Sequence, residues 1–175
     1  MAKRSRQQIR RDEEQIILQL QQNARENIDQ MAKNLGFSRQ KIWRVINRLE
    51  EDQKIWGYTA VVDEERLGLK HFIALIKRTQ VPVDQQIIQK MPGVELDDFL
   101  PDTQVKPEES LYVHGSYDLL VSFYVKNIVE AKQFCERLNQ KFHGYIASIE
   151  LLETLVPIRK HGIKNPDQTK LKDFW

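Results

Sequence analysis

Three stretches in the first third of the chain space their apolar residues three and four positions apart. They cover residues 12–24, 27–36 and 37–50, and this spacing predicts amphipathic helices that share one core. The turn between the second and third stretches contains Gly36 and spans about three residues, which is typical of a helix-turn-helix. The pattern therefore predicts a helix-turn-helix unit, followed by an extended segment over residues 54–63 that is rich in β-branched and aromatic side chains.

The ends of these helices are marked by capping residues. Asp12 and Asn27 each precede a glutamine by three positions, which is the spacing of a capping box. Ser38 suits the N-cap of the third helix, and Gly36 suits a left-handed helix end. We therefore expect the first helix to begin at Asp12, after a basic tail over residues 1–11.

From residue 69 onward, strand-like and helix-like patterns alternate. The predicted strands cover residues 70–78, 110–115, 117–126 and 146–160, and the predicted helices cover residues 83–91 and 127–142. The order β-α-β-β-α-β is that of a ferredoxin-like fold, with both helices on one face of an antiparallel sheet. The expected fold class is α+β.

These patterns set the expected boundaries along the chain. The helical domain covers residues 12–58, a linker strand and turn cover 59–68, and the ferredoxin-like domain covers 69–158. Residues 159–175 form a loose C-terminal extension, and the hydrophilic stretch 98–110, with two prolines, is expected to be an elaborated loop.

Charge is distributed unevenly between the two parts. Residues 1–58 contain 12 Lys and Arg against 8 Asp and Glu, whereas residues 59–175 contain 15 against 17. A surface that binds a polyanion is therefore expected in the first part. The single cysteine, Cys135, excludes an internal disulfide. The sequence contains neither an apolar run of membrane-spanning length nor a signal peptide, which favours a cytoplasmic protein without a membrane partner.

The third helix divides into two faces. Its apolar stripe, with the spacing i, i+3, i+4 and i+7, consists of Ile42, Val45, Ile46 and Leu49. Arg, Gln and Asn side chains on the opposite face can form paired hydrogen bonds with base edges in the major groove, and cations on the flanks suit phosphates. The predicted DNA-binding residues are Ser38, Arg39, Gln40, Lys41, Trp43, Arg44, Asn47 and Arg48.

A solvated basic helix face is the alternative interpretation. An outward Trp43 is unusual for such a face. It either contacts thymine methyl groups or packs on the segment near Trp56 and Tyr58. The two capped helices that precede the third one favour binding to double-stranded DNA.

The residues resemble the Lrp/AsnC family of feast/famine transcription regulators. The specific part runs from Leu20 to Ala60, and the stretches that carry it include 20–25, 31–38, 48–52 and 55–60. In the second part, residues 115–118 resemble the Gly-x-Tyr-Asp turn of that family. The resemblance covers about 150 residues.

This resemblance implies a winged helix-turn-helix that is joined to a ferredoxin-like dimerisation and effector domain. It implies a homodimer, which in this family often assembles into octamers. It also implies an amino acid or related small molecule near Gly115, Tyr117 and Asp118, where backbone N–H groups suit a carboxylate and Asp118 suits an amino group. The alternative is that Asp118 only caps or pairs locally.

Three positions depart from the family pattern. Val45-Ile46 stand where Arg-Val or Arg-Ile is usual, and Gln53 stands where glycine follows the recognition helix. About a dozen extra residues lie between Gly93-Val94 and Leu111. Base preference, wing geometry and ligand identity are therefore not fixed by the resemblance.

An enzyme is the main rival class, because sirohaem decarboxylases share this architecture. They have His-x-Tyr-Asn-x-Trp at the turn where this chain has residues 115–120 with neither His, Asn nor Trp at the matching positions. The four histidines lack metal-ligand spacing, so we expect no catalytic residues, metal or cofactor. A ligand-sensing assembly protein without DNA binding is the other rival.

Overall fold

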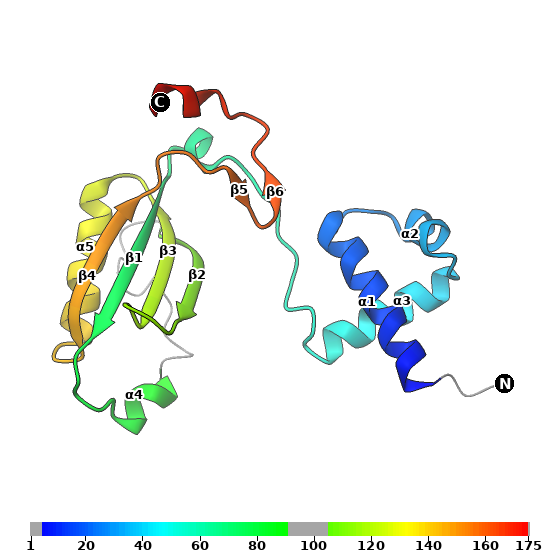
Figure 1. Ribbon diagram of the computed structural model, residues 1–175, viewed down its shortest axis with the longest axis horizontal. Coiled ribbons are helices and arrows are strands. Elements are labelled where there is room, and N and C mark those ends of the chain that lie inside the picture. Colours follow the sequence, from blue (N-terminus) through cyan, green and yellow to red (C-terminus); the bar gives the residue numbers. More distant parts are fainter. Residues whose placement is uncertain (1–4, 91–104, 175) are drawn as a thin grey trace. The chain divides into compact units, whose positions relative to one another are not determined.

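The computed structural model describes residues 5–90 and 105–174. The chain divides into two compact units, residues 1–60 and residues 61–175. The first unit is helical, and the second contains an antiparallel sheet (Figure 1). Each unit has its own hydrophobic core.

The first unit consists of α1 (Arg6–Gln22), α2 (Ile28–Leu35) and α3 (Arg39–Glu51). Asn27 caps α2 by accepting hydrogen bonds from two backbone N–H groups, and Gly36 ends it in the left-handed region. The Ser38 hydroxyl caps α3. The predicted apolar stripes meet in one core, whose buried members are Ile16, Met31, Ala32, Ile42, Val45 and Leu49. The predicted helix-turn-helix and its core stripe are confirmed.

The first helix begins earlier than the sequence suggests. Ser5 caps α1 and accepts a hydrogen bond from the Gln8 backbone N–H, so residues 6–11 are helical rather than part of a tail. Asp12 lies in the middle of α1 and is only 3% exposed. The prediction that Asp12 caps this helix is wrong, because its carboxylate is occupied by side chains within the unit.

The segment after α3 is extended but unpaired. Residues 56–63 form no ladder with another strand in the described part of the chain. The strand predicted there is therefore wrong for this single chain, because a strand needs a hydrogen-bonding neighbour. Trp56 in this segment is 97% exposed.

The second unit contains a four-stranded antiparallel sheet. Its strands are β1 (Lys70–Arg78), β2 (Lys106–Tyr112), β3 (Leu119–Val125) and β4 (Ile146–Glu153), in the order β2-β3-β1-β4. With α4 (Gln85–Lys90) and α5 (Ile128–Lys141), the element order is β-α-β-β-α-β. The predicted ferredoxin-like fold is confirmed.

One face of this sheet packs against α5. Asn127 caps α5 by accepting from the backbone N–H groups of Val129 and Glu130. The core between α5 and the sheet contains Phe72, Phe123 and Phe134, all fully buried. The α4 region differs from the prediction, because Ile88, expected to face inward, is exposed. Met91, also expected inward, lies outside the described residues.

Strand β2 starts within the expected loop. Residues 106–110 pair with β3, so this part of the loop prediction is wrong. Pro107 is tolerated because β2 is an edge strand and the register shifts between Pro107 and Glu109. Residues 98–104 of the expected loop lie outside the described ranges.

The C-terminal segment is ordered rather than loose. It forms the hairpin β5 (Arg159–Lys160) and β6 (Ile163–Lys164), followed by the 3-10 helix η4 (Thr169–Phe174). Lys160 and Lys170 form ion pairs with Glu64 and Glu65. Both acids belong to η1 (Glu64–Leu67), at the start of the second unit. The prediction of a loose extension is wrong, because these ion pairs attach the segment.

No helix in the described ranges is both long enough and apolar enough to cross a membrane.

Candidate nucleic-acid interface

The outer face of α3 is accessible. Gln40, Trp43 and Arg44 are exposed, and Asn47 is half-buried. The opposite face carries the fully buried Ile42 and Leu49. Burial of this stripe fixes which way the helix turns its polar side chains. The outer face therefore offers amide and guanidinium groups that can pair with base edges.

Trp43 remains largely accessible, with 59% of its surface exposed. Trp56 is almost fully exposed and therefore does not cover it. Tyr58 is held to the end of α3, where its hydroxyl donates to Glu50 Oε1 over 2.9 Å. Burial and the Glu50 carboxylate raise the pKa of Tyr58 to about 12. A thymine methyl contact by Trp43 stays a prediction.

Lys41 does not lie on the accessible flank where the helical wheel was expected to place it. Its side chain is buried, and Nζ lies 2.8 Å from Asp12 Oδ2. The ammonium also lies 3.0 Å from the centre of the Phe37 ring. The exposed-flank prediction for Lys41 is wrong, because a buried carboxylate on α1 neutralises it inside the unit.

Arg48 is also engaged within the unit. Its Nη2 lies 2.6 Å from Glu13 Oε1, and Lys54 Nζ approaches Glu13 Oε2 at 3.0 Å. The Arg48 side chain is 41% exposed, so it lies at the surface but is not a free cation. The expectation of a free phosphate ligand at Arg48 is not supported by this geometry.

The start of α3 has two different roles. Ser38 Oγ accepts from the Lys41 backbone N–H at 3.2 Å, which makes it a structural cap. Arg39 Nε lies 2.6 Å from Asp29 on α2, but its side chain is 72% exposed. Contact with DNA by these two residues stays a prediction.

The position after α3 keeps a left-handed turn without glycine. Gln53 has φ 55°, and the backbone N–H groups of Lys54 and Ile55 both donate to the Leu49 carbonyl. These two hydrogen bonds satisfy a carbonyl group at the end of the helix, but they require Gln53 to adopt a conformation that favours glycine. The departure at Gln53 therefore changes the residue type and not the turn.

The proposed effector turn is held by local hydrogen bonds. Asp118 Oδ2 accepts from the Arg78 backbone N–H at 2.8 Å, and the Asp118 N–H donates to the Ile76 carbonyl at 2.9 Å. The Tyr117 hydroxyl donates to Glu150, and this hydrogen bond raises the pKa of Tyr117. Local pairing of Asp118 is thus observed. Ligand binding by Gly115, Tyr117 and Asp118 stays a prediction.

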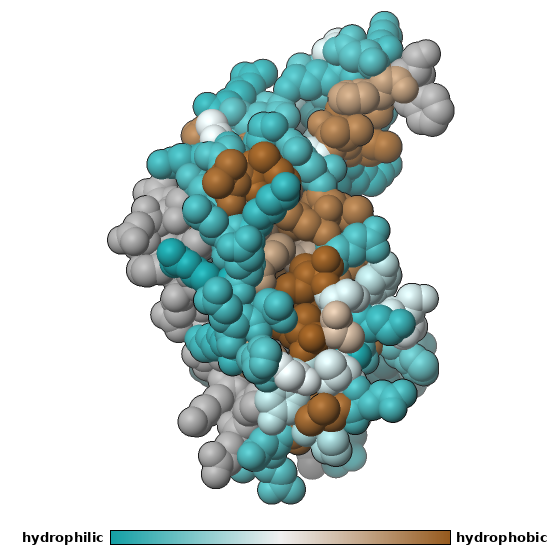
Figure 2. Space-filling model, turned by 90° about the vertical axis from the view of Figure 1, so that its left-hand side faces the viewer, coloured by the Kyte–Doolittle hydropathy of each residue, from teal (hydrophilic) through white to brown (hydrophobic). Residues whose placement is uncertain are grey.

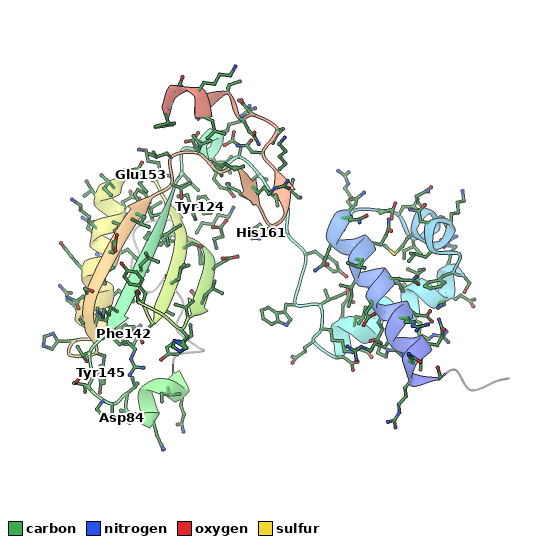
Figure 3. All side chains as sticks on the ribbon, in the orientation of Figure 1. Asp84, Tyr124, Phe142, Tyr145, Glu153 and His161 are labelled. Carbon is green, nitrogen blue, oxygen red and sulfur yellow. The ribbon has the colours of Figure 1, made fainter. Side chains whose placement is uncertain are left out.

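A polar cluster on the second unit escaped prediction. His71 Nδ1 lies 2.6 Å from Thr154 Oγ1, and His71 Nε2 lies 2.7 Å from Glu108. The Tyr124 hydroxyl donates to Glu108 over 2.8 Å. Figure 3 shows Tyr124 and Glu153 at the same end of the sheet, with His161 on the β5–β6 hairpin. Burial and Glu108 raise the pKa of Tyr124.

This end of the sheet also contains a cavity of about 230 Å³, lined in part by Glu64, His71, Tyr124 and Lys160. The described residues contain no group of three or more His, Cys, Asp and Glu side chains arranged to hold a metal ion.

The sheet face opposite α5 carries several apolar side chains beside polar ones such as Ser122 and Glu150. Cross-strand partners share a face, so the pairs Leu75↔Leu120, Leu111↔Leu120 and Ile73↔Leu152 place five apolar residues there, in two neighbouring rows. We call these five residues the open face. Leu111 and Leu152 are exposed. Hydrophobic residues also reach the surface as patches on the side of the molecule that Figure 2 presents.

The two acids that engage α3, Asp12 and Glu13, were missed as site residues. A signal for Asp12 existed, because it lies four positions before the fully buried Ile16 and so on the same helix face. Nothing comparable in the sequence marks Glu13 as the partner of Arg48.

Comparison with known proteins supports this assignment of the helical unit. The family of winged helix-turn-helix DNA-binding domains matches residues 13–55. The HTH-type transcriptional regulator FL11 of Pyrococcus furiosus is 24% identical over 152 residues, which cover 85% of this chain and 89% of the relative.

Solved structures share the whole architecture. An AsnC family transcriptional regulator from Agrobacterium tumefaciens is 21% identical with a TM-score of 0.63, over 85% of this chain and 91% of that one. The transcriptional regulator NMB0573 from Neisseria meningitidis, solved as an L-Met complex, is 14% identical with a TM-score of 0.62, over 90% and 94%.

The fold and the α3 surface thus define a transcriptional regulator with a winged helix-turn-helix and a ferredoxin-like domain, and its curated relatives are named as regulators rather than enzymes. The chain contains a winged helix-turn-helix DNA-binding domain, and over most of its length it is similar to HTH-type and AsnC family transcriptional regulators.

Proposed function

We propose that this regulator binds specific DNA sequences as a homodimer, with the outer face of each α3 in a major groove. The observation that carries the proposal is the accessibility of Gln40, Arg44 and Asn47 opposite a fully buried stripe. Arg pairs with guanine, and Gln or Asn pairs with adenine, through two hydrogen bonds each. No acidic side chain lies on α3 before Glu50.

Dimerisation is supported by the open face. Apolar residues that include Leu111, Leu120 and Leu152 lie on a sheet face that α5 does not cover. A second copy of the same face is a matching partner, because a two-fold interface places the same residues on both sides. The exposed Trp56 and the unpaired extended segment 56–63 offer a second surface for the partner chain. Two copies of α3 would then read two half-sites.

We extend the proposal to an amino-acid effector near the turn that contains Tyr117 and Asp118. The L-Met complex of a protein with this fold supports the ligand class. The Tyr117 hydroxyl already bonds to Glu150 and Asp118 to the Arg78 backbone, so a ligand would have to share or replace those bonds.

Selection from a pool of random 30-base-pair duplexes, with the full chain as bait, tests the proposal. We expect enrichment of a two-fold symmetric sequence. In mobility shifts, Arg44→Ala should reduce the preference for the selected duplex over a scrambled one by about 1–3 kcal/mol, or roughly 5- to 150-fold. Lys132→Ala, an exposed change on α5, is the matched control and should leave this preference unchanged.

Failure to enrich any sequence would contradict specific binding, and enrichment without two-fold symmetry would contradict the dimer. The same shift assay with each of the twenty amino acids tests the effector. An amino acid that changes the affinity supports it, and unchanged affinity with all twenty contradicts it.

A further inference from the structure

Two neighbouring acids on α1 bind two cations of α3. Asp12 Oδ2 lies 2.8 Å from Lys41 Nζ, and Glu13 Oε1 lies 2.6 Å from Arg48 Nη2. Gln8 Nε2 donates to the second oxygen of Asp12 over 3.1 Å. Both acids therefore direct their charge toward α3 rather than toward solvent. We call these two ion pairs the α1–α3 clamp.

The spacing of the clamp restricts the direction of α3 as well as its position. Lys41 and Arg48 are seven residues apart, which is two helical turns or about 10 Å along the axis. A single attachment point would let the helix pivot, whereas two points at that separation oppose pivoting. Because the outer face must meet base edges within hydrogen-bond distance, a small change of helix direction would misplace it.

Burial makes the first of the two pairs strong. Asp12 and Lys41 are 3% and 8% exposed, so water screens their attraction little. The ammonium of Lys41 also lies over the ring of Phe37, which precedes α3. One cation thus joins α1, the turn of the helix-turn-helix and the recognition helix.

We propose that Asp12 and Glu13 are positioning residues for DNA recognition, and that Lys41 and Arg48 act as internal anchors of α3 rather than as phosphate ligands. The inference rests on the proposed function for its biological meaning. It differs from that function in a measurable way, because an anchor and a phosphate ligand contribute differently to the salt dependence of binding.

Salt dependence distinguishes the two roles. Each phosphate neutralised by a cation makes the slope of log K against log[salt] more negative by about 0.9. Arg39→Gln, at a cation whose side chain is 72% exposed, is the comparison and should lower the magnitude of the slope by about 0.9. Arg48→Gln should leave the slope unchanged. A loss of about 0.9 for Arg48→Gln would overturn the proposal.

A charge swap tests the anchor directly. Lys54 also binds Glu13, so the swap is made in a Lys54→Gln background. In that background, Arg48→Glu alone should weaken binding to the selected duplex at least tenfold and reduce its preference over the scrambled duplex. Adding Glu13→Arg restores an ion pair of reversed polarity, and it should return both quantities to within about threefold of the Lys54→Gln chain.

A double swap that fails to restore binding would indicate that Arg48 contacts DNA. If Arg48 contacts a phosphate, the new carboxylate at position 48 repels DNA in the double swap as well, and binding stays weak. That outcome would overturn the proposal when circular dichroism shows the helices intact. If the helices are lost, the slope of Arg48→Gln decides alone.

Failure of the proposed function can be told apart from failure of this inference. A wild-type chain without sequence preference would contradict specific recognition, but the slopes on scrambled DNA would still show whether Arg48 neutralises a phosphate.

Discussion

Each unit of this protein contains a buried carboxylate that binds lysine, but the two carboxylates hold different kinds of structure. In the first unit, Asp12 binds Lys41 between two packed helices. In the second, Glu64 is 6% exposed and accepts from Lys160 and Lys106, which belong to the β5–β6 hairpin and the edge strand β2. The first carboxylate reinforces a hydrophobic core, whereas the second joins segments far apart in sequence.

This difference separates two uses of a buried ion pair. The core of the first unit already brings α1 and α3 together. The ion pair there therefore restricts the orientation of α3 and is not needed to bring the helices into contact. The segments that meet at Glu64 include the C-terminal hairpin. Its Ile163 remains exposed, as does Ile158 just before it. The ion pairs are therefore a larger share of what holds that hairpin in place.

The largest expected effect comes from breaking the first pair. Lys41→Met leaves the buried Asp12 carboxylate without the cation that neutralises it, which should lower the unfolding free energy of the first unit by about 3–5 kcal/mol. The double change Asp12→Leu with Lys41→Met removes both charges, and its stability should be close to that of the wild type. Native-state hydrogen exchange of α3 and β1 amides reports the two units separately.

A loss below about 1 kcal/mol for Lys41→Met would show that the buried pair is not held as the structure indicates. Exchange at β1 is the internal control, and it should not change.

Removing the second carboxylate should cost less. Glu64→Gln weakens two charge-assisted hydrogen bonds, one from the half-exposed Lys106, so we expect a loss of about 1–2 kcal/mol in the second unit at pH 7. Glu136→Gln, an exposed change on α5, is the matched control.

The pH dependence of Glu64 gives a sharper result. Burial is the largest effect and would raise its pKa. The hydrogen bonds from Lys160 and Lys106, a backbone hydrogen bond and the charge of Lys160 together outweigh burial, so the pKa lies below its ordinary value of 4.5. The stabilisation is therefore present above the ordinary pKa and is lost as pH falls through the lowered one. The stability difference between wild type and Glu64→Gln should therefore shrink as pH falls below 4.5 and through the lowered pKa. A difference that persists or grows in acid would contradict the assignment.

Much of the fold was readable from local patterns. The Asn27 and Ser38 caps, the stripe that includes Ile42 and Leu49, and the strands of the sheet follow from short-range periodicity and capping chemistry. These features depend on residues within one or two turns of each other, which is why the sequence alone predicts them.

The missed features depend on partners far away in the sequence. Lys41 lies four residues before Val45 and so near the core stripe, but a lysine is seldom buried unless it is paired. Its partner Asp12 is on another helix. The hairpin β5–β6 has strands of only two residues, too short for any period, and its attachment uses Glu64 and Glu65. Whether residues 56–63 pair as a strand depends on a neighbouring strand, and no local sequence pattern predicts that neighbour.

The most direct test of the account is site-specific photocrosslinking from the outer face of α3. In a Cys135→Ser background, Gln40→Cys and Lys132→Cys are each labelled with an aryl azide and irradiated with the selected duplex. Gln40 is exposed on α3 and Lys132 is exposed on α5. We expect crosslinks to major-groove bases of each half-site from position 40 and none from position 132. Equal crosslinking from both positions, or none from position 40 while the duplex remains bound, would contradict recognition by this face of α3.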